Sequence, residues 1–152
     1  MRRSPHLALA VLALSLGGCR GKLVTRAELH APGNATARFH AGAGQKLRLW
    51  ADTEGTWTGS KSSHFPVAYT VDVQQGGKSL GRIQCDTRQS GMAVCGSSSN
   101  IFGEHSADCE YELGCALPPH AAGEVVLQVE GHFPEPGRVK KVSLMSLVVR
   151  ED

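Results

Sequence analysis

Several short segments of the chain alternate between apolar and polar residues with a period of two. The pattern recurs in residues 23–30, 35–41 and 45–53. In the third segment, alternation directs Leu47, Leu49 and Ala51 to one side and Trp50 to the polar side. Side chains that alternate in this way lie on opposite faces of a β-strand. The pattern therefore predicts strands with one buried face and one solvent-exposed face. No segment shows the apolar spacing that is typical of an amphipathic helix.

Further strands are predicted toward the C-terminus. Residues 67–87 read as a β-hairpin around Gly76–Gly77, because two glycines accept the positive φ angles of a tight primed turn. Shorter apolar segments follow at residues 92–95, 124–133 and 139–149. About eight short strands separated by turn signals favour two packed antiparallel sheets. We therefore expect an all-β sandwich, of jelly-roll or immunoglobulin-like type, in a single domain.

The N-terminal residues have a different character. Arg2 and Arg3 precede a short apolar run, residues 7–16, which is followed by the small residues of "LSLGGC". The run is shorter than the roughly 20 residues that span a bilayer and has the length of a signal-peptide core. This arrangement resembles the lipobox of bacterial lipoproteins, which ends at Cys19.

The resemblance implies that Cys19 is diacylated and becomes the first residue of the mature protein. Residues 1–18 are then the signal peptide, residues 19–34 a lipid-anchored segment with the first strand, and residues 35–152 the sandwich. The membrane is thus an expected partner through the anchor, and the location is the bacterial cell envelope. By resemblance to enteric lipoproteins, Arg20 after the cysteine suggests the outer membrane. The alternative is an ordinary signal peptide cut nearby.

The chain contains five cysteines, an odd number. With Cys19 acylated, Cys85, Cys95, Cys109 and Cys115 remain for two disulfides in an oxidising compartment. Their spacing lacks the short C-x₂₋₄-C pairs of zinc sites. Of the three possible pairings we favour Cys85 with Cys95 and Cys109 with Cys115. These bridges would staple the stretch 85–115, a Gly/Ser-rich insertion that looks too polar for the core.

Charge argues against nucleic-acid binding. The full chain has 16 Lys and Arg against 14 Asp and Glu, and without Arg2 and Arg3 the two counts are equal. A chain with no net charge and scattered basic residues lacks the positive electrostatic potential that attracts nucleic acid.

No motif of an enzyme or a metal site is evident. His64, His105, His120 and His132 show neither catalytic-motif nor metal-ligand spacing. The acidic residues Asp108, Glu110 and Glu112 have the oxygen ligands that calcium prefers. Because they are spaced two apart, the simpler interpretation is that they lie on one solvent-exposed face of a strand. We therefore expect no catalytic residue, no bound metal and no cofactor.

A binding module is the favoured class. Trp50, Trp57 and Phe65 lie in or beside the loop-rich stretch 50–66, where exposed rings would form a platform for a glycan or a protein. The alternative is that the tryptophans fold down and cover a sheet edge. Three interpretations stay open: an envelope lipoprotein that binds a protein or glycan through its loops, a purely structural envelope component, and a hydrolase with an unrecognised site.

Overall fold

The computed structural model describes residues 20–60 and 63–152, and the proposed anchor residue Cys19 lies outside them. The described chain forms nine strands and two short 3₁₀ turns. The strands are β1 (Lys22–Ala27), β2 (Gly33–Ala41), β3 (Leu47–Thr58), β4 (Ala68–Gln75), β5 (Lys78–Asp86), β6 (Met92–Ile101), β7 (Glu104–Glu112), β8 (Gly123–His132) and β9 (Val139–Glu151). The turns are Thr87–Gln89 and Pro136–Arg138.

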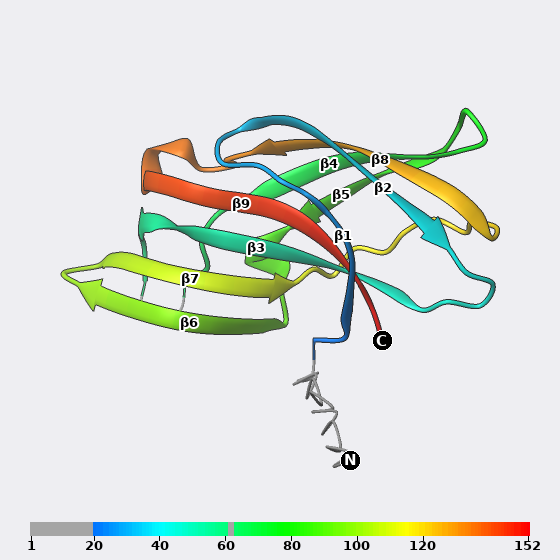
Figure 1. Ribbon diagram of the computed structural model, residues 1–152. Helices are drawn as coiled ribbons and strands as arrows, with labels where there is room; N and C mark the ends of the chain where they lie inside the picture. The colour runs from blue at the N-terminus through cyan, green and yellow to red at the C-terminus, as the bar shows by residue number, and fades with distance from the viewer. Residues whose placement is uncertain (1–19, 61–62) are drawn as a thin grey trace, which may run out of the picture.

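The strands form two antiparallel sheets that pack face to face (Figure 1). The larger sheet has the order β1-β9-β3-β7-β6 and the smaller one the order β2-β8-β4-β5. The prediction of an all-β sandwich is confirmed, with one strand more than the alternation suggested.

The strand pairing is nested. β4 pairs with β5, β3 with β7, β2 with β8 and β1 with β9, so the chain resembles one long hairpin that is folded over into two sheets. This is the jelly-roll arrangement. β6 is an additional strand, paired only with β7 at the edge of the larger sheet.

The core lies between the sheets and consists of the inward side of the alternating segments. Ala37, Phe39, Leu49 and Ala51 are buried, as predicted. Leu23 was expected to face inward and is instead exposed. It lies beside a register irregularity in β1, where the strict alternation breaks.

A buried hydroxyl ties the two sheets together. The Tyr69 hydroxyl, on β4, donates to the carbonyl oxygen of Met145, on β9, over 3.0 Å. Complete burial raises the pKa of this phenol well above its ordinary value, so the hydroxyl keeps its proton.

The predicted hairpin is confirmed. β4 and β5 are joined at Gly76 and Gly77, whose φ angles of 60° and 75° are those of a tight turn that only small or flexible residues accept without strain.

The stretch 85–115 is more ordered than predicted. It holds β6 and β7, and β7 is an inner strand of the larger sheet. The expectation that this stretch is too polar for the core is wrong for β7, because its inward positions Cys109 and Tyr111 are buried. Its acidic residues Asp108, Glu110 and Glu112 lie on the opposite face of the same strand.

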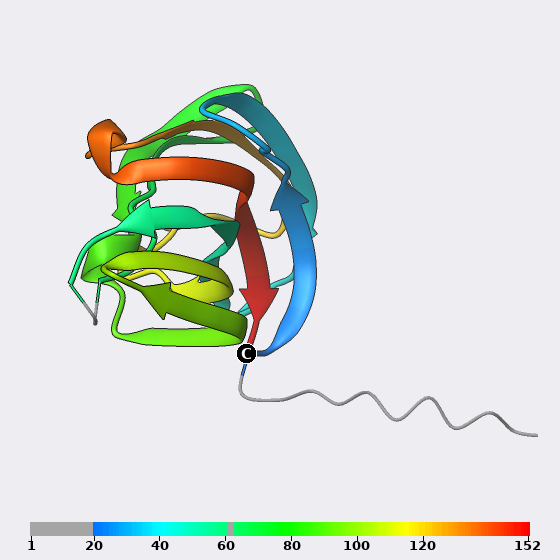
Figure 2. The ribbon, with the colours of Figure 1, turned by 90° about the vertical axis from the view of Figure 1, so that its left-hand side faces the viewer.

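The described chain begins and ends at the same end of the larger sheet. Lys22 of β1 is opposite Glu151 of β9, and Glu151 is opposite Leu47 of β3. Figure 2 shows β1 and the last part of β9 side by side down to the C-terminus. The turn between β6 and β7 lies at the other end of the sheet, at the left of Figure 1.

Candidate functional site

The three aromatic residues expected at a binding platform are buried. Trp57 and Phe65 pack edge to face with ring centroids 5.4 Å apart, and both belong to the core. Trp57 is buried because it occupies an inward-facing position of β3. The Thr and Gly residues around it suggest a loop, so this position is not evident from the sequence. These rings therefore do not form an exposed platform, and the alternative that both tryptophans cover a sheet edge is not met either, because both belong to the inner strand β3.

Trp50 takes the outward side of β3, as alternation predicts, but it is only 1% exposed. Its neighbours across the sheet are Glu112 and Val148, and Arg48 on the same face forms ion pairs with Glu112 and Asp152. The Trp50 ring is thus buried on a face that also carries ion-paired side chains. Trp50 and Trp57 consequently lie on opposite faces of the sheet and do not form one site.

The larger sheet extends one strand beyond the smaller one, and a groove of about 330 Å³ lies on its inner side. We call it the inner groove. Every position of β6 is exposed except Val94, which is partly buried. The lining residues are Trp57, Ser63, His64, Ala93, Cys95, Ser98, Ser99, Asn100, His105, Ala107, Cys109 and Tyr111.

Two histidines form part of the inner groove. His105 stacks on Trp57 with ring centroids 5.1 Å apart, and its Nε2 lies 3.3 Å from the carbonyl oxygen of Gly59. His64 tilts against Tyr111, and its Nδ1 donates to the carbonyl oxygen of Thr87 over 2.7 Å. A carbonyl oxygen only accepts, so the contact with Thr87 places a proton on Nδ1 of His64.

The floor and rim of the inner groove differ in chemistry. The disulfide between Cys95 and Cys109 and the Ala93 side chain supply apolar surface, whereas Ser98 and Asn100 supply hydroxyl and amide groups. Apart from the histidines, no lining residue is ionisable at neutral pH. Such a surface suits an uncharged ligand with both apolar faces and hydroxyl groups.

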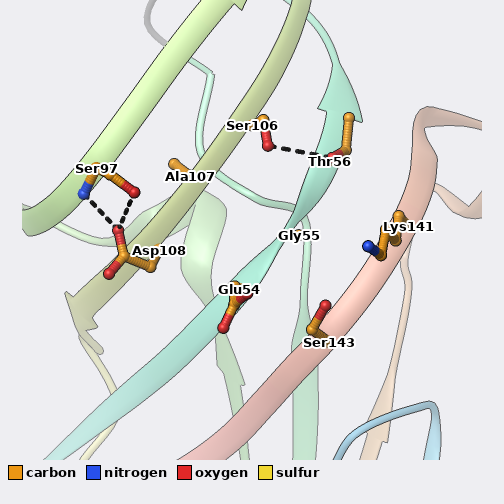
Figure 3. A pocket seen from close by; sticks show the side chains of 9 residues that line it. All are labelled: Glu54, Gly55, Thr56, Ser97, Ser106, Ala107, Asp108, Lys141 and Ser143. Atoms are coloured by element: carbon orange, nitrogen blue, oxygen red, sulfur yellow. Dashed lines mark hydrogen bonds between the residues drawn. The ribbon is translucent and has the colours of Figure 1, made fainter.

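A second groove, of about 260 Å³, lies on the outer face of the same sheet (Figure 3). We call it the outer groove, and Glu54, Asp108 and Lys141 are its charged residues. Asp108 accepts from the backbone N–H and the hydroxyl of Ser97, and these bonds lower the pKa of its carboxyl group. Thr56 and Ser106 form a hydrogen bond of 3.4 Å across its upper part.

The acidic trio behaves as the alternation predicts. Asp108, Glu110 and Glu112 all lie on the outer face of β7, opposite Glu54, Asp52 and Trp50 of β3. Glu110 is paired with Arg20 and Arg150, and Glu112 with Arg48. Within the described ranges, no three His, Cys, Asp or Glu side chains are placed to hold a metal ion together.

The structure corrects the disulfide pairing. The bridges are Cys85–Cys115 and Cys95–Cys109, not Cys85–Cys95 and Cys109–Cys115. Cys95 and Cys109 are directly opposite in the β6–β7 ladder, and their Cα atoms are 4.1 Å apart. Cys85–Cys115 ties the end of β5 to the connection that follows β7. The preference for short closed loops failed because sheet register, not sequence distance, brings the cysteines together.

The sequence analysis missed most of the inner groove. His64 and His105 were noted without being assigned to a site, and Ser98, Ser99, Asn100 and Tyr111 were not singled out. The apolar pattern predicted only the first part of β6, residues 92–95, and its continuation to Ile101 becomes visible only with the register of Cys95 and Cys109.

No protein-family model, curated protein or solved structure matches this chain. Neither 3₁₀ turn of the described segments is long or apolar enough to cross a bilayer. What the chain does must therefore be argued from its own residues.

Proposed function

We propose that this chain is a non-catalytic lipoprotein of the bacterial cell envelope that binds a neutral glycan in the inner groove. The observation that carries the proposal is the lining of this groove, where the exposed apolar surface of Ala93 and Cys95 lies beside the hydroxyl and amide groups of Ser98 and Asn100. Sugars present apolar ring faces and hydroxyl groups together, which this combination complements. Its volume of about 330 Å³ is near the lower limit for ligand pockets, the size of a few sugar units at most.

The contacts of the histidines support a binding role over hydrolysis. Among the hydrogen bonds of the described residues, neither His64 nor His105 contacts a carboxylate or a serine hydroxyl. A hydrolase site of the acyl-transfer kind needs a nucleophile, a base and an orienting group within mutual reach. The inner groove offers rings and neutral polar groups instead.

The envelope location is supported by the lipobox and by the two disulfides. Disulfides form in oxidising compartments such as the periplasm and the cell surface. Acyl chains on Cys19 would attach the protein stably, because two or more chains suffice for lasting membrane binding.

Nuclear magnetic resonance titration of the soluble Cys19→Ser chain with maltotriose and chitotriose tests the glycan site. We expect shift changes confined to Ser98, Asn100 and the Trp57 indole N–H. Asn100→Ala should weaken binding about tenfold, which corresponds to the loss of one hydrogen bond. Thr56→Ala, in the outer groove, is the matched control and should leave binding unchanged. Shifts centred on the outer groove, or none with either sugar, would refute the assignment.

Fractionation of cells tests the anchor separately. Wild-type protein should sediment with membranes and incorporate labelled palmitate, and Cys19→Ser should move it to the soluble fraction. A mutant that stays membrane-bound, together with an unlabelled wild type, would show that the lipobox is not used.

A further inference from the structure

β6 differs from the other edge strands of the sandwich. β1 carries Lys22 and Arg26, β2 carries Arg38, and β5 carries Lys78 and Arg82. Charged side chains on an edge strand prevent it from pairing with another chain. β6, with the sequence MAVCGSSSNI, has no charge and no proline along its ten residues.

A bulge divides β6 into two halves. Cys95 is opposite Cys109 and Ser98 is opposite Ala107, so Gly96 and Ser97 together face the single residue Asp108. The extra residue reverses the alternation between the halves. The outer face therefore carries Met92, Val94, Ser99 and Ile101, and the inner face carries Ala93, Cys95, Ser98 and Asn100.

This alternation fits β6 to a second copy of itself. Consider an antiparallel pair with full overlap, in which Met92 of one copy is opposite Ile101 of the other. Val94 is then opposite Ser99 on the outer face, and Ala93 is opposite Asn100 on the inner face. Every opposed pair lies on one face, as an antiparallel ladder requires. Without the bulge, the same overlap would place each residue opposite one from the wrong face.

We propose that β6 pairs antiparallel with β6 of a second copy of this chain. The two-fold axis passes between Gly96 and Ser97 and joins the two larger sheets into one sheet of ten strands. The inner grooves of the two copies then lie side by side across the seam, because both contain the inner face of β6.

The exposed apolar residues point to the same partner. Met92 is 40% exposed and Ile101 is 64% exposed, and they stand at the two ends of β6 on one face. Antiparallel self-pairing brings each of them opposite the other, twice per dimer, where cross-strand apolar pairs stabilise a ladder. An unrelated extended peptide would match this edge only if it carried the same spacing of apolar residues.

Analytical ultracentrifugation of the soluble Cys19→Ser chain tests the proposal. We expect a reversible dimer in the micromolar range. Met92→Lys with Ile101→Lys places like charges opposite each other at both ends of the seam and should weaken dimerisation at least tenfold. Both positions are exposed, so circular dichroism should show an unchanged fold. Leu23→Lys, an equally exposed leucine on the edge strand β1, is the matched control and should leave the dimer intact.

A charge-reversal variant tests the register. Met92→Lys with Ile101→Glu places opposite charges across the seam and should restore the dimer relative to the double-lysine variant. A wild-type chain that is monomeric at 100 micromolar, or a dimer that the lysines leave unchanged, would overturn the proposal. Binding of an extended peptide along β6 by a monomeric chain would overturn it as well, in favour of a different occupant. None of these measurements depends on the glycan site, so either proposal can fail alone.

Discussion

His30 shows how much a single exposed side chain can be constrained by its neighbours. Its Nδ1 lies 2.9 Å from the carbonyl oxygen of Ser143, and its Nε2 lies 2.8 Å from the Glu28 carboxylate. A neutral imidazole has only one N–H to donate, whereas the protonated ring donates to both acceptors. The bond to Ser143, followed by the bond to Glu28, raises the pKa of His30 above its ordinary value of 6.5.

A pH titration of the His30 ring by nuclear magnetic resonance should therefore give a midpoint above 6.5. Because the folded-state pKa is raised, the added stability is complete below the unfolded-state value and is lost as the pH rises through the folded-state value. Glu28→Gln should lower the midpoint part of the way, since the bond to Ser143 remains. A wild-type midpoint at or below the ordinary value would show that these two bonds do not form in solution.

Alternation predicts which face of a strand a residue takes, but not what covers that face. It placed Phe39, Leu49 and Trp50 on the correct sides of their strands. It did not predict that Trp50 is buried on the outer face, where Arg48 also forms ion pairs with residues of distant segments. For Trp57 the surrounding Thr and Gly residues suggested a loop, and only the pairing of β3 with β7 shows that its ring points inward.

At the level of strands, the packing of β3 against β9 leaves no room for a side chain at Gly55. The register of the two strands shifts between Glu54 and Gly55, where β9 has an irregularity. A Cβ atom on Gly55 would lie 2.5 Å from the carbonyl oxygen of Lys141 and 2.7 Å from the Phe65 ring. Neither neighbour can move easily, since one is backbone and the other is a buried core ring.

We expect Gly55→Ala to destabilise the fold by about 1–3 kcal/mol, the usual cost of overpacking. Urea unfolding under non-reducing conditions, followed by tryptophan fluorescence, measures this change. Gly137→Ala is the matched control, because a Cβ there has no neighbour within 4 Å, and it should change stability by less than about 0.5 kcal/mol. Equal stability of the two variants would mean that β3 and β9 can separate locally without loss.

The elements that depend on local sequence were predictable, and those that depend on register were not. Gly76 and Gly77 alone are enough to predict the turn between β4 and β5. The partner of Cys95 depends on how β6 aligns with β7, and that alignment includes a bulge that no local pattern reveals. The inner groove has the same origin, because it exists only where β6 extends beyond the smaller sheet.

For the whole molecule, the proposed dimer constrains how an anchored protein can lie on a membrane. The N-terminal end of the larger sheet is opposite the β6–β7 turn, and β7, with nine residues, separates the two ends by roughly 30 Å. Antiparallel pairing directs the N-terminal ends of the two copies away from each other. Both anchors reach one bilayer only if the strands lie along its plane.

Fluorescent labels at Lys46→Cys, near the N-terminal end, and at Phe102→Cys, at the β6–β7 turn, test this orientation. In vesicles with a headgroup-attached quencher, both labels on the lipidated dimer should be quenched to a similar degree. In the Met92→Lys, Ile101→Lys background, the label at position 102 should be quenched less than the label at position 46. Unequal quenching in the dimer itself would exclude a flat arrangement.

The nested pairing also governs when the chain can fold. β1 is the first strand to leave any pore that delivers the chain N-terminus first, yet its partner β9 is the last, and Gly21 and Arg150, which share a hydrogen bond, are 129 residues apart. Of the four nested pairs, only β4 with β5 is local in sequence, and the additional strand β6 forms a second local pair with β7. Chains dominated by distant pairings fold slowly. β1 must therefore wait, without its partner in the sheet and open to proteases and chaperones, until the final strand arrives.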